Sequence, residues 1–151
     1  MRRVKTWLIR AALALTVLFA LSAAPATAFA KPKVEWSKID VPIGDSSARI
    51  TKFLKQALDQ AVKKANFGKK AKSVTLSARV VELRAEQRGD VLQMTCTMMG
   101  RVVGAASAKS KISFGGSPSM RDELEKQVLT TVANGLVARL AQIARAQEPK
   151  E

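Results

Sequence analysis

The longest alternation of apolar and polar positions in the chain runs from Ser73 to Phe114. Alternation is typical of β-strands, because successive side chains of a strand point to opposite faces of the sheet. It predicts three strands, through Val74–Glu86, Leu92–Met99 and Ala108–Phe114. In the third of these, the apolar positions Ile112 and Phe114 face the core and Lys109 and Lys111 face outward.

Gly89 and Asp90 predict a two-residue hairpin of type II′ between the first two strands. This turn sets a register in which apolar residues oppose apolar residues, and a slip of one residue would set them against charge. The predicted pairs are Arg88 with Val91, Ala85 with Met94, Leu83 with Cys96, and Val81 with Met98. The apolar parity changes at Val80–Val81, which predicts a β-bulge there. Cys96 is therefore expected to be buried and unreactive.

A helical pattern lies on each side of this region. The first begins at Asp45, Ser46 or Ser47, repeats apolar residues at three- and four-residue spacing, and ends at Asn66 and Gly68. The second begins at Ser117 as the cap and Pro118 as the first helical residue, and continues to about Ala146. Its apolar stripe is wide enough to cover a sheet.

These elements predict one α+β domain at residues 47–146, with two helices packed on one face of an antiparallel sheet. The sheet has three strands, or four if Val34–Ile39 adds one, in the order (β)-α-β-β-β-α. Residues 31–46 form an N-terminal segment, in which Trp36 is expected to be a packing residue, and residues 147–151 form a frayed tail.

Residues 1–30 have the three parts of a cleavable secretory signal. Basic residues are followed by the apolar run Ala11–Leu21 and then by small residues that allow cleavage after Ala28 or Ala30. An uncleaved membrane anchor is the alternative, but the run is shorter than the roughly 20 residues that span a bilayer. No cysteine follows the run, so a lipoprotein is not expected. The sequence predicts a periplasmic or secreted protein, soluble after cleavage, with no transmembrane span.

The charge of the chain is strongly basic, at +14. Four of the 26 Lys and Arg residues lie before Lys31, which leaves 22 against 12 Asp and Glu in the exported part. This balance favours acidic partners or anionic surfaces, and outside the cytoplasm these are lipid head groups, lipopolysaccharide and acidic polymers rather than nucleic acid. A general basic bias of the surface is the other interpretation.

Two groups of basic residues form the candidate polyanion or partner surface. One is the lysine run at the end of the first helix and after it; the other lies on the outward face of the sheet, which would also suit an ordinary sheet facing water. The candidates are Lys63, Lys64, Lys69, Lys70 and Lys72 in the run, and Arg79, Arg84, Arg101, Lys109 and Lys111 on the sheet.

Catalytic chemistry has few candidates in this sequence. There is no histidine, which removes the commonest general base and the commonest zinc ligand. The single cysteine, Cys96, lies on the predicted apolar face and has no activating neighbour, so it is neither a nucleophile nor half of an intramolecular disulfide. We expect no catalytic residue, no metal site and no cofactor.

The sequence therefore predicts a non-enzymatic, exported interaction module that binds an envelope protein through an open sheet edge or through the outward sheet face. The alternative is a basic protein that binds polyanions or membrane surfaces, such as anionic lipid or lipopolysaccharide. An enzyme would require a nucleophile or base that the pattern does not reveal.

Overall fold

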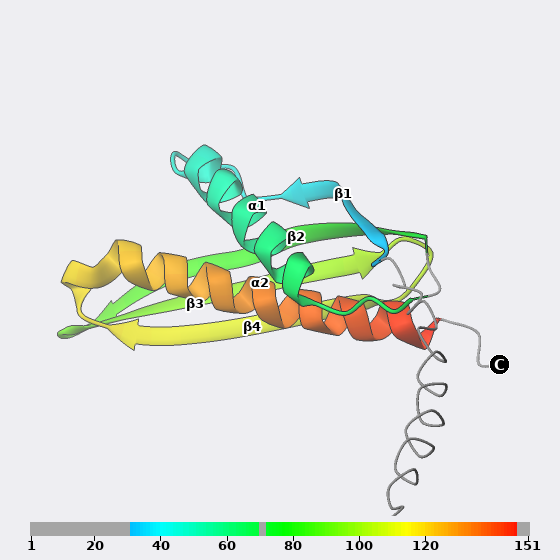
Figure 1. Ribbon diagram of the computed structural model, residues 1–151. Coiled ribbons are helices and arrows are strands. Elements are labelled where there is room, and N and C mark those ends of the chain that lie inside the picture. Colours follow the sequence, from blue (N-terminus) through cyan, green and yellow to red (C-terminus); the bar gives the residue numbers. More distant parts are fainter. Residues whose placement is uncertain (1–30, 70–71, 148–151) are drawn as a thin grey trace, which may run out of the picture.

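The computed structural model describes residues 31–69 and 72–147. The elements are β1 (Lys33–Asp40), α1 (Ser47–Lys64), β2 (Ser73–Arg88), β3 (Val91–Val102), β4 (Ser107–Gly116), a 3₁₀ turn (Pro118–Met120) and α2 (Arg121–Ala146). The strands form one sheet in the order β1-β2-β3-β4, and both helices lie on the same face of it (Figure 1). The predicted α+β class and element order are confirmed. Residues 1–30, which carry the predicted signal, lie outside the described residues, as does the end of the predicted tail.

The N-terminal segment contributes the fourth strand, and this strand runs parallel to β2. The sheet is therefore mixed rather than purely antiparallel. The reason is the connection: α1 carries the chain back along the sheet between β1 and β2, so both strands run in the same direction. Trp36 and Val34 point toward the helices and pack against the core, as expected for Trp36.

The hairpin between β2 and β3 has the predicted register at three of the four pairs. Gly89 has a φ of 61°, the left-handed conformation that the first position of a primed turn requires. The bulge is confirmed, but it displaces Val81, so Val80 rather than Val81 pairs with Met98. Val81 was wrongly predicted to face the core; it is 47% exposed because the extra residue of a bulge is turned out of the alternation.

The core lies between the helices and the inner face of the sheet. Alternate residues of β3 are buried there, including Met94, Cys96 and Met98, and the equivalent positions of β4 face the same way. On α2, the apolar stripe from Leu124 to Leu140 covers β3 and β4. On α1, the buried face packs against α2 and β1, so the two helices lie side by side on the sheet.

The helix ends differ from the sequence expectation in their capping. Ser46 and Ser117 stand near the two helix starts, but neither side chain accepts a capping hydrogen bond. Ser117 Oγ instead bonds Ser119 Oγ at 2.8 Å, within the 3₁₀ turn that precedes α2. The predicted left-handed stop of α1 at Asn66 and Gly68 is wrong: the helix ends at Lys64, and its C-cap Ala65 is in the extended conformation. Gly68, with a φ of 94°, lies in the following loop, where its N–H donates to Asn66 Oδ1 at 2.9 Å.

Candidate functional site

The outer sheet face, which points away from both helices, is not covered by any other described element. Its residues alternate with the buried ones, so the register places them in rows across neighbouring strands. Most are hydroxyl-bearing or charged. Thr97 on the central strand β3 is nevertheless only 3% exposed, because side chains of β2 and β4 flank it.

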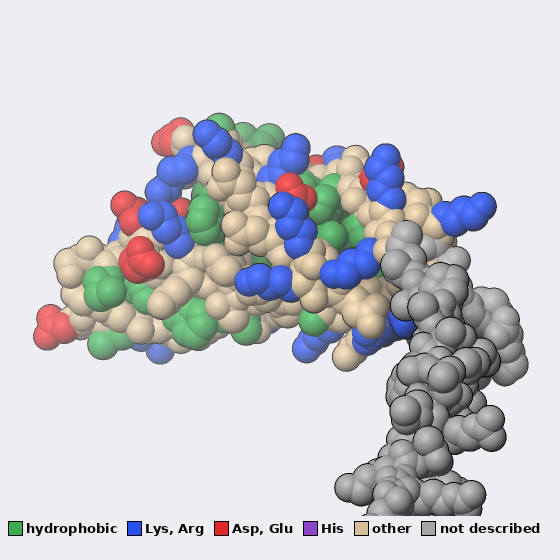
Figure 2. Space-filling view, in the orientation of Figure 1, with side chains coloured by type: hydrophobic (Ala, Val, Ile, Leu, Met, Phe, Trp, Pro, Cys, Tyr) green, Lys and Arg blue, Asp and Glu red, His purple; other side chains and the backbone are tan. Residues whose placement is uncertain are grey.

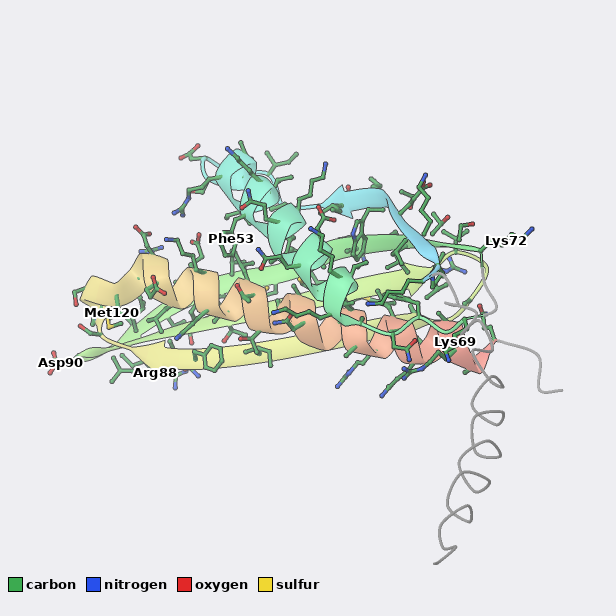
Figure 3. All side chains as sticks on the ribbon, in the orientation of Figure 1. Phe53, Lys69, Lys72, Arg88, Asp90 and Met120 are labelled. Atoms are coloured by element: carbon green, nitrogen blue, oxygen red, sulfur yellow. The ribbon has the colours of Figure 1, made fainter. Side chains whose placement is uncertain are left out.

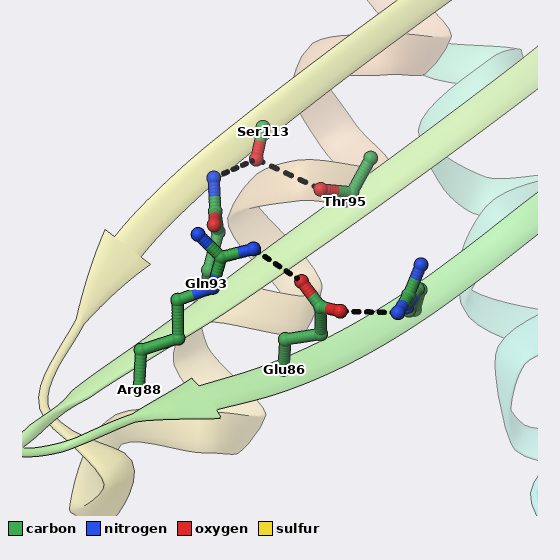
Figure 4. Close-up of polar contacts among 6 residues, drawn as sticks. Glu86, Arg88, Gln93, Thr95 and Ser113 are labelled. Atoms are coloured by element: carbon green, nitrogen blue, oxygen red, sulfur yellow. Dashed lines mark hydrogen bonds and ion pairs between the residues drawn. The ribbon is translucent and has the colours of Figure 1, made fainter.

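At the end of the outer face near the Gly89–Asp90 hairpin, polar side chains pair with one another in two separate groups (Figure 4). Glu86 accepts from Arg88 Nη2 at 3.3 Å and also pairs with Arg84. Gln93 Nε2 donates to Ser113 Oγ at 3.1 Å, and the same hydroxyl bonds Thr95 at 2.8 Å. These groups satisfy each other. Arg84, a predicted surface residue, shares the single carboxylate of Glu86 with Arg88, so these three residues keep one net positive charge.

The middle of the outer face carries four basic residues, which we call the basic strip: Arg79, Arg101, Lys109 and Lys111. All four are exposed, and none forms an ion pair within the described residues. Arg79, Met99 and Lys109 are opposite one another in a single row across β2, β3 and β4, and Asp40 of β1 lies beside Arg79, beyond one end of this row. Two strand spacings separate the ends of this row, about 10 Å.

The rows next to this one contain the rest of the strip. Arg101 lies in the row of Ser77 and Ser107, and its Nε donates to the carbonyl of Ala105 at 3.3 Å. Lys111 lies in the row of Thr97 and Glu82, whose side chains are linked by a 3.4 Å hydrogen bond. The strip is therefore continuous over adjacent rows, and it surrounds the half-buried Met99.

The predicted lysine run is at the other end of the molecule. Lys69 and Lys72 lie at the end opposite the Gly89–Asp90 hairpin (Figure 3). Lys63 and Lys64 occupy the last turn of α1 as predicted, and Lys70 lies outside the described residues. The nine predicted residues that the structure describes therefore lie on two separate surfaces, which match the two groups in the sequence.

A cavity of about 480 Å³ lies beside the end of α1. Lys63, Lys64 and Lys69 line it together with Lys31, which precedes β1. Its apolar wall includes Val34, Val62 and Phe67, and Phe67 is 3% exposed. Lys72 is not among its lining residues. The sequence did not indicate Lys31, because 32 positions separate it from Lys63 and only the parallel pairing of β1 with β2 brings the two together.

The surface over the helices is basic as well. Figure 2 shows the helix-covered side, along which Lys and Arg side chains are spread over the whole length of the molecule. Arg49 pairs with Glu125 at 2.8 Å, which links the starts of α1 and α2. Arg145 Nη1 donates to the carbonyl of Asn66 at 3.1 Å, which holds the loop after α1 against α2.

Cys96 is fully buried, as the register predicted. Burial, with a smaller contribution from the charge of Glu82, raises the pKa of its thiol to about 12. A thiol with this pKa is protonated at neutral pH and is a poor nucleophile.

Among residues 31–69 and 72–147, no group of three or more His, Cys, Asp or Glu residues is placed to hold a metal ion. In the same part of the chain, no helix is long and apolar enough to cross a membrane.

No protein-family model and no curated protein matches this chain. Solved structures of similar shape include a minor lipoprotein from Acinetobacter baumannii, at 12% identity and a TM-score of 0.46, covering 70% of this chain and 92% of that one. A hypothetical protein from Chlamydia trachomatis has 10% identity and a TM-score of 0.49, with 78% and 100% covered. The PelC dodecamer from Paraburkholderia phytofirmans has 15% identity and a TM-score of 0.43, with 78% and 96% covered. At these identities and scores, the similarities establish nothing about the activity or location of this chain.

Proposed function

We propose that this chain is a non-enzymatic interaction module, exported to the periplasm or beyond, which binds a protein partner with an acidic surface through its outer sheet face. The basic strip is the observation that carries this proposal. Export rests on the signal pattern of residues 1–30.

The arrangement of charge on the outer face supports a partner rather than simple solvation. On β1, neighbouring charges pair within the strand: Lys33 with Glu35 at 2.6 Å, and Lys38 with Asp40 at 2.8 Å, the second pair beside the strip. The four strip residues form no ion pair within the described residues, although Asp40 lies opposite Arg79 and Glu82 lies in the row of Lys111. Mutual repulsion of their like charges is unfavourable in the isolated chain. An acidic partner would remove this repulsion, and Met99 at its centre offers an apolar contact of the kind that is enriched in interfaces.

Capture from an envelope extract on the immobilised protein tests the proposal. Arg79→Glu/Lys109→Glu reverses two charges of the strip, and Lys52→Glu/Lys55→Glu makes the same charge change on the exposed side of α1. We expect a defined protein to bind the natural chain and the α1 variant, to be released by moderate salt, and to be lost from the strip variant. A partner that the strip variant retains, or that both variants lose equally, contradicts the proposal.

A further inference from the structure

The geometry points to a second site, independent of the outer sheet face: the cavity at the end of α1 binds an anionic lipid, with its phosphate among the lysines and part of an acyl chain on the apolar wall. We call this cavity the α1-end cavity; it is lined by Lys31, Lys63, Lys64 and Lys69 with Val34, Val62 and Phe67.

The charge of the α1-end cavity is of one sign. Its four lysines come from the residues before β1, from the last turn of α1 and from the loop after it, and none of the described residues that line the cavity is a carboxylate. Lys64 also lines a neighbouring cavity of about 320 Å³, whose described lining includes Arg145 and no acidic residue. Cleavage after Ala30, one of the two predicted sites, would add the α-amino group of Lys31 to the same rim. A group of ammonium ions of this kind attracts phosphate.

The helix dipole alone would not place an anion here. The end of α1 is its negative end, which favours the lysines themselves but disfavours an anion. Two of the carbonyls at this end, those of Ala61 and Val62, accept from the Ala65 N–H at 3.0 and 3.2 Å. Two lysines are enough to balance the helix end, whereas Lys31 comes from the segment before β1 and adds charge that the helix does not need.

The wall of the cavity distinguishes a lipid from a free anion. Phe67, Val34 and Val62 belong to the core or pack against it, and each presents part of its surface to the cavity. Burying apolar surface there contributes about 25 cal/mol per Å², which inorganic phosphate or a polar polyanion cannot use. A ligand with a phosphate at one end and a hydrocarbon chain at the other fits both features.

Binding of short-chain dihexanoylphosphatidylglycerol below its micellar concentration, measured by titration calorimetry, tests the inference. The matched probes are glycerol phosphate, which keeps the anion, and dihexanoylphosphatidylcholine, which keeps the chains. We expect the phosphatidylglycerol to bind at least about tenfold more tightly than either probe, which corresponds to about 1.4 kcal/mol.

Lys63→Ser/Lys64→Ser should weaken this binding at least tenfold, while Lys52→Ser/Lys55→Ser, which removes the same charge from another part of α1, should leave it within twofold. Val62→Asp, on the half-buried wall, should weaken phosphatidylglycerol more than glycerol phosphate. Equal loss with both lysine pairs would mean that general surface charge binds the lipid, and equal affinity for glycerol phosphate would mean that the apolar wall is not used. Either result overturns the inference, and neither affects the proposal for the outer sheet face.

Discussion

Cys96 shows most clearly how the position of a residue in a strand determines whether its side chain is buried. Its position in the alternation of β3 predicted that it faces the core, and its side chain is fully buried opposite Leu83 on β2 and Ile112 on β4. The prediction succeeded because a half-buried strand couples side-chain direction to sequence parity. The same rule gave a wrong prediction for Val81. The change of apolar parity at Val80–Val81 shows that a bulge is present, but it does not show which of the two residues is the extra one that turns away from the core.

The buried thiol predicts slow chemical modification. A thiol reagent at pH 8 should label Cys96 of the folded protein at least about a thousandfold more slowly than in denaturant, because labelling requires opening of the core. Mass spectrometry of the labelled protein over time measures the two rates. Rapid labelling of the native protein would contradict the position of Cys96 on the inner face.

The raised pKa of Cys96 predicts a loss of stability at alkaline pH. The thiol is protonated in the folded protein up to a pH of about 12, whereas in the unfolded chain it ionises above its ordinary pKa of 9.0. Its contribution to stability is therefore fully present below pH 9 and is lost as the pH rises toward 12.

Between pH 9 and 10, the free energy of unfolding should fall by about 1 kcal/mol more in the natural chain than in Cys96→Ala. Lysine ionisation is common to both proteins and cancels in the comparison. Urea unfolding at several pH values measures the difference, and identical pH dependence in the two proteins would refute it.

At the scale of the elements, the contact between α2 and β4 explains a feature that the helix pattern left unaccounted for. Gly135 lies inside α2, where glycine costs about 1 kcal/mol relative to alanine. A Cβ at this position would lie 2.9 Å from Ser110 Oγ and 3.9 Å from Ser110 Cβ. Glycine is therefore required by the close approach of the helix to the buried hydroxyl of Ser110.

A double-mutant cycle tests this explanation. Gly135→Ala should give no gain in stability in the natural chain, because the gain in helix propensity is offset by the contact with Ser110. In the Ser110→Ala background, the same substitution should raise the free energy of unfolding by about 1 kcal/mol. Chemical denaturation of the four proteins gives the coupling energy. Equal effects of Gly135→Ala in both backgrounds would show that the contact does not limit the position.

The elements also show what the sequence could not determine. Periodicity located both helices, the hairpin and the bulge, because each depends on neighbouring residues. The direction of β1 depends on which strand it meets after the connection through α1, and local pattern does not contain that information. The prediction that the side chains of Ser46 and Ser117 cap the two helices was also wrong. A residue of a suitable type at a helix start need not adopt the capping geometry.

At the scale of the whole molecule, the same mixed topology divides the basic residues into two surfaces. The sequence separated the lysine run from the basic residues of the sheet, but it did not give their neighbours: β1 brings Lys31 to the end of α1, and the strand order sets Arg79, Met99 and Lys109 in one row. Arg84 lies outside the basic strip and pairs with Glu86, two residues along the same strand. The sequence thus predicted the outer sheet face as a basic surface, and the structure limits the candidate site to its middle.

The central claim is that the basic strip is the contact surface for a protein partner. Site-specific photo-crosslinking in the producing cell tests it most directly, with the photoreactive residue at Lys111 in the strip or at Lys52 on the exposed side of α1. We predict a discrete adduct from position 111, of a mass that corresponds to this chain plus a different protein, which disappears when Arg79→Glu/Lys109→Glu is added. An adduct from position 52 alone, adducts of twice the mass of this chain, or an adduct at 111 that survives the charge reversal would contradict the claim.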